Sequence, residues 1–180
     1  MLFETFERES SANLALCEKY SGQLPSELID IWQKYGFGSL LNGYLKVIDP
    51  DEYRDLLDDT YILSGSAIPI FATAFADIVT WEKGRYLRMV DYKNGTFSGM
   101  SAGFKFFWGD LADGAFNGKF FDLELYDAAA GKLGRPRFDE CFGYVPLLGL
   151  GGGRGVDSLR RVKLREHIAL IAQLMGKVGE

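Results

Sequence analysis

Apolar residues recur at helical spacing early in the chain. Four of them stand at positions i, i+3, i+4 and i+7 and so share one face of a helix: Leu28, Ile31, Trp32 and Tyr35. Pro25 suits the first turn of this helix, where its missing N–H would be unpaired in any case. Gly36 can end the helix in the left-handed conformation. The pattern therefore predicts a helix that starts in the segment Leu24–Glu27 and ends before Gly36.

A short strand and a second helix are expected next. The strand covers Tyr44–Ile48. After it, Asp49 is placed to cap a helix, Pro50 takes the first helical position, and Glu52 completes the spacing of a capping box. Three apolar residues give this helix its inner face: Tyr53, Leu56 and Leu57.

The middle of the chain has the composition of β-strands. Three segments are rich in β-branched and aromatic residues: Ile68–Phe75, Asp77–Glu82 and Arg85–Tyr92. Two dipeptides are typical of hairpin turns: Lys83–Gly84 and Asn94–Gly95. The apolar alternation within Arg85–Asp91 is imperfect, which indicates a sheet that is partly covered on both faces. We therefore expect a central antiparallel sheet from about Ile68 to Met100.

The pattern turns helical again in the last third of the chain. Phe104–Leu133 is expected to form short helices, because three glycines interrupt it: Gly109, Gly114 and Gly118. Phe138–Gly155 is expected to form a loop and a strand. A long amphipathic helix is predicted from about Val156 to Val178. Its apolar stripe comprises Leu164, Ile168, Ile171 and Met175, and its water-facing side comprises Lys163, Glu166 and Gln173.

Together these elements predict an α+β fold, in which helices flank the central antiparallel sheet. The chain has 180 residues, of which 47% are hydrophobic and 25% charged, so it can bury a core without disulfide or metal support. We expect two regions, residues 1–100 and residues 101–180 with the terminal helix, packed as one compact unit.

Charge and rare residues exclude several classes of protein. The net charge is -5, which argues against direct nucleic-acid binding. One histidine and two separated cysteines, Cys17 and Cys141, cannot build the usual zinc site, and we expect neither a metal nor a cofactor. Free thiols favour a reducing compartment. The acidic start at Met1–Glu4 does not resemble a signal peptide, and no apolar run is long enough to span a membrane, so a cytoplasmic protein is expected.

The glycine-rich segment Gly149–Gly155 is placed between a predicted strand and a predicted helix, where a phosphate-binding loop would stand. It lacks the Gly-Lys pair of a Walker loop, and Arg154 replaces the third small residue of the dinucleotide fingerprint. A flexible connector is the simpler interpretation. An anion site remains as the alternative, and it would use Gly151, Gly152, Gly153 and Arg154.

No catalytic constellation is visible. His167 is the only histidine, and its position at the flank of the last apolar stripe predicts a packed side chain at the edge of the core. Cys141 follows Asp139 and Glu140, and acidic neighbours raise the pKa of a thiol, so a buried, unreactive cysteine is expected. We therefore predict that the protein is not an enzyme.

Charge is segregated along the chain. The segment Asp49–Asp59 is acidic, with Arg54 as its single basic residue, and Arg154–Glu166 is mainly basic. Such segments are usually solvated faces, but they can also steer a charged protein partner. Five acidic side chains are the candidates for partner binding: Asp51, Glu52, Asp55, Asp58 and Asp59. The basic residues are Arg154, Arg160, Arg161, Lys163 and Arg165.

Several segments, in order along the chain, resemble the GAD-like domain family. Leu24–Gly38 resembles its opening "LPxELxxFWxxYGFG", and Asp49–Tyr53 resembles its "NPxxY" segment. Ile68–Asp77 is similar to the "PIxxTAFGDxxxW" pattern, with Trp81 at the tryptophan position. Ala76 departs from this pattern, which often has glycine there.

The C-terminal half resembles a second, companion domain. Asp139–Pro146, with the glycines that follow Leu148, is similar to the domain of unknown function in type VI secretion DNase-immunity proteins. Lys163–His167 continues this similarity, and Gly153 is an additional glycine. The resemblance implies a non-enzymatic immunity-type protein that binds and neutralises a basic, DNase-like protein toxin. The alternative is a small-molecule or nucleotide-binding protein, or an enzyme, that uses Gly149–Gly155 and Arg154.

Overall fold

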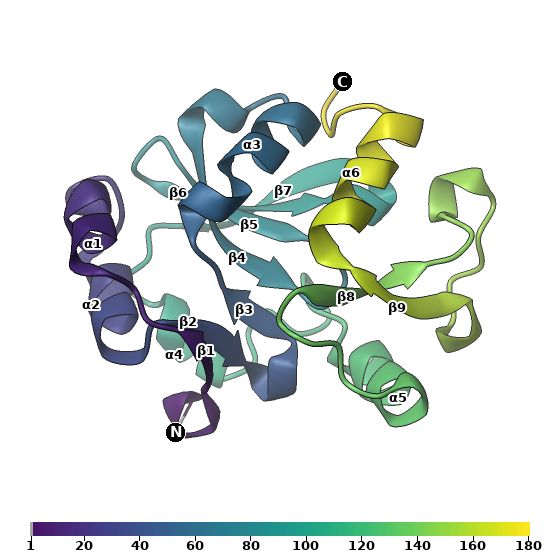
Figure 1. Cartoon of the computed structure of the whole chain (residues 1–180), viewed down its shortest axis with the longest axis horizontal. Coiled ribbons are helices and arrows are strands. Elements are labelled where there is room, and N and C mark those ends of the chain that lie inside the picture. The colour runs from purple at the N-terminus through teal and green to yellow at the C-terminus, as the bar shows by residue number, and fades with distance from the viewer. Residues whose placement is uncertain (1) are drawn as a thin grey trace.

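A seven-stranded antiparallel sheet forms the centre of the computed structural model, which describes residues 2–180 (Figure 1). Each strand pairs with the strand that follows it in the sequence, so the order in the sheet is β1 to β7. The strands are β1 (Glu7–Ser10), β2 (Phe37–Leu40), β3 (Leu45–Val47), β4 (Ala67–Thr73), β5 (Ile78–Glu82), β6 (Tyr86–Asp91) and β7 (Thr96–Ala102). The predicted α+β fold with a central antiparallel sheet is confirmed.

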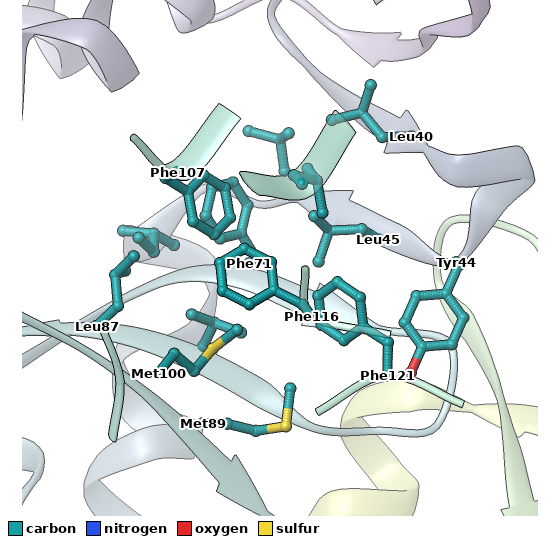
Figure 2. Packing of buried hydrophobic residues seen from close by; sticks show 14 of the residues in the cluster. Leu40, Tyr44, Leu45, Phe71, Leu87, Met89, Met100, Phe107, Phe116 and Phe121 are labelled. Atoms are coloured by element: carbon teal, nitrogen blue, oxygen red, sulfur yellow. The ribbon is translucent and has the colours of Figure 1, made fainter. Parts of the chain in front are cut away.

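Apolar side chains cover both faces of the sheet. Because side chains alternate along a strand, neighbouring residues enter different clusters: Val79 joins the first cluster and Ile78 the second. The first cluster receives side chains from α1 (Leu14–Tyr20), α2 (Ser26–Tyr35), α4 (Phe107–Ala112) and α5 (Leu123–Leu133). Phe71 of β4 lies at its centre, and its ring stacks on that of Phe107 with centroids 5.1 Å apart (Figure 2).

The second face is covered by α3 (Pro50–Thr60) and α6 (Leu164–Met175), which lie side by side (Figure 1). Asp49 caps α3, since its carboxylate accepts a hydrogen bond of 2.8 Å from the backbone N–H of Asp51. The predicted inner faces are confirmed, because Tyr53, Leu56 and Leu57 of α3 are buried, as are Leu164, Ile168 and Ile171 of α6.

The last helix is shorter than its pattern predicts. Leu159–Lys163 forms strand β9, which pairs with β8 (Glu140–Tyr144) in a separate two-stranded sheet, and α6 begins only at Leu164. The prediction of a helix from Val156 was therefore wrong, because pairing with β8 satisfies the backbone of this segment. Met175, the last residue of the predicted apolar stripe, is 48% exposed.

Short 3-10 helices connect the longer elements. They are η1 (Leu2–Thr5), η2 (Leu41–Gly43), η3 (Ser64–Ser66), η4 (Tyr92–Asn94), η5 (Leu148–Leu150) and η6 (Val156–Ser158). Gly36 ends α2 with φ +80°, and a Cβ there would overlap the backbone oxygen of Ser10, so both the turn and the approach of β1 require glycine.

A buried lysine links the sheet to the C-terminal half. Lys46 of β3 is 1% exposed, and its Nζ donates hydrogen bonds to the backbone oxygens of Arg137, at 3.0 Å, and of Glu140. Burial lowers the pKa of Lys46 to about 8. The folded protein therefore holds this proton less tightly than the unfolded chain does.

This pKa shift predicts a rise in stability with pH. The unfolded chain keeps the Lys46 proton up to about pH 10.5, whereas the folded protein releases it from about pH 8. Between pH 7.5 and pH 9 the free energy of unfolding should rise by about 1 kcal/mol from this group. Urea unfolding of the wild type and of Lys46→Met across this range tests the effect. The variant should lack the rise, and parallel curves for the two proteins would contradict the assignment.

Candidate functional site

All five acidic residues predicted to bind a partner lie on the solvent face of α3. Asp51, Glu52, Asp55, Asp58 and Asp59 are exposed, because the opposite side of the helix is buried against the sheet and α6. We call these five residues the acidic face of α3. The sequence predicts that several of them meet solvent, because Asp51, Asp55, Asp58 and Asp59 cannot all share the face of Tyr53 and Leu56. The structure exposes all five.

Two carboxylates of the acidic face are held by neighbours. Asp51 pairs with Lys19 of α1 at 2.6 Å, and Asp58 pairs with Arg54 one turn earlier at 2.7 Å. Slight burial would raise the pKa of Asp51, but hydrogen bonds from Lys19 and Tyr20 outweigh it and hold the pKa below its usual value. The other three members form no ion pair within residues 2–180, so their charge is free to act on a partner: Glu52, Asp55 and Asp59.

The basic segment does not form a matching helix. Its residues are divided among the loop before β9, β9 itself and the start of α6. Arg160 and Arg161 are adjacent on strand β9, so their side chains point to opposite sides. Lys163 pairs with Asp139, and the Arg165 guanidinium lies over the ring of Tyr53, 5.4 Å from its centroid. The helical basic surface expected from the sequence is therefore absent from the described chain.

The glycine-rich loop joins two strands. Gly149–Gly155 lies between β8 and β9 and leads through the 3-10 helix η6 into β9, so no α-helix N-terminus follows it. The prediction that this loop opens a helix was wrong. The anion-site alternative depended on the dipole at the N-terminus of that helix, and the loop is not followed by an α-helix. A Cβ at Gly152 would overlap the backbone oxygen of Pro146, which accounts for one glycine by close packing.

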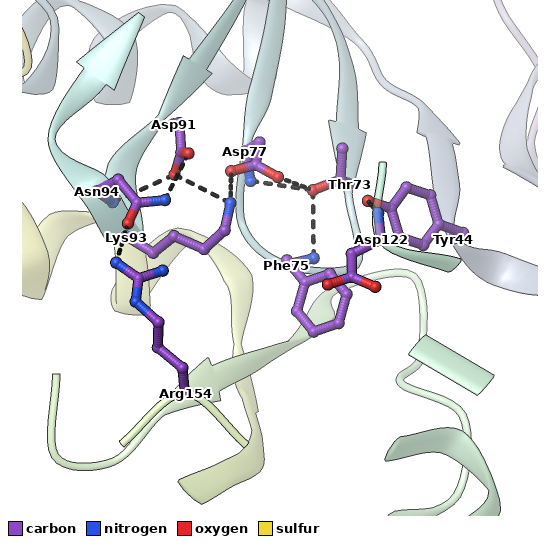
Figure 3. A network of polar contacts seen from close by, with 9 residues as sticks. All are labelled: Tyr44, Thr73, Phe75, Asp77, Asp91, Lys93, Asn94, Asp122 and Arg154. Carbon is purple, nitrogen blue, oxygen red and sulfur yellow. Dashed lines mark hydrogen bonds and ion pairs between the residues drawn. The ribbon is translucent and has the colours of Figure 1, made fainter. Parts of the chain in front are cut away.

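Arg154 takes part in a chain of polar contacts that runs into the interior (Figure 3). Its Nη2 donates to Oδ1 of Asn94 at 2.7 Å, and Nδ2 of Asn94 donates to Oδ2 of Asp91 at 2.7 Å. Lys93 then bridges two carboxylates, with its Nζ 2.9 Å from Asp91 and 2.5 Å from Asp77. The guanidinium of the alternative anion site thus already has a partner within the protein.

Asp77 is the buried end of this chain of contacts. It is 1% exposed and accepts a hydrogen bond of 2.7 Å from the hydroxyl of Thr73. Burial raises the pKa of Asp77 to about 6, and Lys93 opposes part of that rise. Burial would lower the pKa of Lys93, but the carboxylates of Asp77 and Asp91 raise it above its usual value. At neutral pH the pair is ionised and tightly held.

The turn that presents Asp77 explains one departure from the family pattern. Thr73 and Asp77 close the turn, because the backbone N–H of Thr73 donates a hydrogen bond of 2.9 Å to the backbone oxygen of Asp77. Ala76 within it has φ +63°, in the left-handed region where glycine is favoured. The family's frequent glycine at this position therefore has a backbone cause, and alanine here carries some strain.

A surface groove of about 640 Å³ opens beside this network. The sequence did not predict this groove, because its walls come from separate segments: the turn at Phe75 and Asp77, the residues Asp91 and Lys93, and the stretch 117–124. The only sequence signal was the segment Ile68–Asp77, noted for its family resemblance. Four acidic side chains line the groove, with Lys93 and Lys119 as the basic ones: Asp77, Asp91, Asp122 and Glu124.

The two residues considered for catalysis from the sequence, Cys141 and His167, are both buried. Cys141 is fully buried, and burial raises its pKa to about 12, so its thiol stays protonated. The predicted direction is correct, but burial is the main cause and the acidic neighbours are secondary. His167 is 7% exposed at the core edge, as predicted, and burial lowers its pKa. Within residues 2–180 no group of three or more His, Cys, Asp or Glu side chains could hold a metal ion.

Between residues 2 and 180, each helix is too short or too polar to cross a lipid bilayer. The longest helix, α6, has 12 residues, whereas a spanning helix needs about 20.

Two family models and a solved structure are similar to this chain. The family model for the GAD-like domain matches residues 2–91, and the model for the C-terminal part of the T6SS immunity protein Tdi1 matches residues 101–175. The crystal structure of Atu4351 from Agrobacterium tumefaciens is similar in fold, with a TM-score of 0.78 and 14% sequence identity over 95% of this chain and 86% of that chain. No curated protein sequence matches significantly. The resemblance found in the sequence is confirmed, and the chain belongs to the GAD-like domain family, with a C-terminal part that matches the Tdi1 immunity-protein family.

Proposed function

We propose that this protein is a cytoplasmic immunity protein, which binds a protein toxin and neutralises it without catalysing a reaction. The observation that carries this proposal is the match of residues 101–175 to the C-terminal domain of T6SS immunity protein Tdi1. The buried, protonated thiol of Cys141 and the buried His167 support a binding role, because neither is placed as a nucleophile or a general base.

The partner we propose is a basic nuclease. A DNase must hold the phosphates of DNA and therefore has a positive surface around its active site. The acidic face of α3 is complementary to such a surface, and Glu52, Asp55 and Asp59 add negative charge that no ion pair neutralises. Occlusion of the nuclease by this face would stop it from binding DNA.

A charge reversal on α3 tests this docking surface. Asp55→Lys/Asp59→Lys should reduce the association rate with the cognate nuclease toxin about tenfold at low salt, because charge complementarity mainly accelerates association. The variant should also lose most of the salt dependence of that rate. Surface plasmon resonance at two salt concentrations measures both effects. These two residues are preferable to Asp58, whose change would also break its pair with Arg54.

A matched control separates position from net charge. Asp30→Lys/Asp127→Lys makes the same change of net charge with exposed residues of α2 and α5. It should leave the association rate close to that of the wild type. Equal rates for the two double variants would remove the acidic face from the interface. Failure of the wild type to inhibit the nuclease at equimolar concentration would contradict the immunity function itself.

A further inference from the structure

A small cavity lies beneath the side of α6 that faces the glycine-rich loop. Its volume is about 130 Å³, and its walls come from η4, the β8–β9 loop and α6. The lining is mostly apolar or aromatic and includes Tyr92, Leu147, Leu148, Ile171 and Met175. An engineered apolar cavity of about 150 Å³ can hold a benzene ring, whereas sites for small-molecule ligands usually measure about 300–1,000 Å³. The cavity therefore has the size of one aromatic side chain.

One polar side chain in the wall of this cavity has no partner. His167 is 7% exposed, and neither ring nitrogen forms a hydrogen bond with any described residue. One edge of the ring lies against Gly143, where a Cβ would collide with the imidazole. Burial lowers the pKa of His167, so the ring is neutral at pH 7 and presents one N–H donor and one acceptor nitrogen. The ring nitrogens are not among the fully enclosed unpaired atoms of the described chain, so a hydrogen-bonding occupant of the cavity can reach them.

The cavity opens within the most apolar part of the exposed surface. Nine large apolar side chains are exposed in the described chain, and five of them belong to the β8–β9 loop or α6: Val145, Leu150, Leu170, Leu174 and Met175. This concentration distinguishes the region from the rest of the surface, where the other four lie far apart in sequence. Exposed apolar clusters rimmed by polar residues mark protein interaction sites.

The geometry of α6 places two of these leucines beside the cavity. Arg165 contacts Tyr53 and so marks the side of α6 that faces α3. At 100° per residue, Leu170 and Leu174 lie about 140–180° away from Arg165, on the side of His167 and Ile171. In Figure 1 the loop between β8 and β9 lies on the side of α6 away from α3. The leucines therefore extend the apolar wall of the cavity onto the surface.

We propose that this cavity and its rim form the anchor site for the toxin, where the rim is the set of exposed apolar residues Val145, Leu150, Leu170, Leu174 and Met175. The anchor is a tyrosine side chain of the toxin, whose hydroxyl donates a hydrogen bond to His167. The proposal rests on the proposed function and names a second contact besides the acidic face of α3. Aromatic residues in desolvated pockets dominate protein interfaces. A tyrosine fits here better than phenylalanine, because its hydroxyl supplies the hydrogen bond that the neutral imidazole lacks.

The single histidine permits a direct test without any toxin. The imidazole resonances of His167 are unique in an NMR spectrum, and p-cresol is the side-chain analogue of tyrosine. Millimolar p-cresol should shift these resonances in a saturable manner, and toluene should bind at least tenfold more weakly. In His167→Phe, p-cresol should lose this advantage over toluene, as judged by methyl shifts of Ile171. No shift with p-cresol, or equal affinity for the two probes, would overturn the tyrosine anchor.

A charge on the rim tests the contact with the toxin. Leu174→Glu/Met175→Glu should raise the Kd for the cognate nuclease toxin at least tenfold, mainly through faster dissociation. Leu14→Glu/Phe106→Glu, with two exposed apolar residues outside this region, is the matched control and should bind like the wild type. Circular dichroism should show that both variants are folded.

The outcomes distinguish this inference from the function it rests on. If the wild type inhibits the nuclease but the rim variant binds equally well, the anchor site is wrong and the immunity function stands. If the wild type does not bind the nuclease, the immunity function fails, and with it the assignment of the occupant to a toxin. A concentration-dependent dimer in gel filtration that Leu174→Glu dissociates would instead assign the rim to a second copy of this chain and overturn the proposal.

Discussion

A fragment of residues 1–102 is expected to lose cooperative folding, although it keeps all seven strands of the central sheet. On the first face it would lose Phe107, Tyr126 and Phe142, and on the second face Leu164 and Ile168. Part of each apolar face would then meet water, because only α1, α2 and α3 would remain to cover the sheet. A domain has only about 5–15 kcal/mol of net stability, so uncovering part of both faces should remove all of it. We therefore expect residues 1–100 and 101–180 to form one cooperative unit.

Urea unfolding and near-UV circular dichroism measure this result. The full chain should show one sigmoidal transition and a near-UV signal from its packed aromatic residues, while the fragment should show neither. The matched control is a chain without residues 179–180, which keeps α6 and the buried Val178 and should retain a single transition. A fragment that unfolds in a sharp transition of its own would instead establish the N-terminal region as an independent domain.

The substitution Asp77→Ala is expected to destabilise the protein by about 3 kcal/mol at pH 7.5. It removes the buried partner of Lys93 and leaves the Thr73 hydroxyl without its acceptor. Breaking a buried pair by removing one charge costs about 3–5 kcal/mol. The lower end applies here, because Asp91 remains within 2.9 Å of the Lys93 ammonium.

Chemical denaturation of this variant and of two companions checks the size of the effect. Asp55→Ala, on the exposed face of α3, should change the free energy of unfolding by no more than about 0.5 kcal/mol. Asp77→Asn keeps a hydrogen-bond acceptor for Thr73 and should fall between the two. If Asp77→Ala were as stable as Asp55→Ala, the buried ion pair would contribute nothing to the fold.

Local signals in the sequence were sufficient for elements whose ends and faces are set by nearby residues. The cap at Asp49 and Pro50 placed the start of α3 correctly, and Gly36 placed the end of α2. The start of α6 was misplaced because Leu159–Lys163 becomes a strand only through pairing with β8, some twenty residues earlier. A pattern read within one segment contains no information on such a distant partner.

The candidate sites also differ in whether nearby residues or distant segments form them. The exposure of the acidic face of α3 follows from helical spacing alone, so the sequence was sufficient to predict it. The ion pair of Asp77 with Lys93 and the cavity at His167 were not foreseen, because each is built from segments that only the fold brings together. His167 was correctly predicted to lie at the core edge, yet its lack of a partner depends on residues of η4 and β8.

The order of strands in the sheet has a consequence for how the chain folds during synthesis. Because every strand pairs with its neighbour in sequence, the sheet can form from local contacts, which are the fast ones. The contacts that close the second face come last, since the backbone N–H of Val178 donates to Thr60 from 118 residues away. At 5–20 residues per second, a ribosome needs about 4–16 s to make residues 101–180. During that interval α1, α2 and α3 cover only part of the two apolar faces, and the uncovered remainder favours aggregation until α4, α5 and α6 have been made.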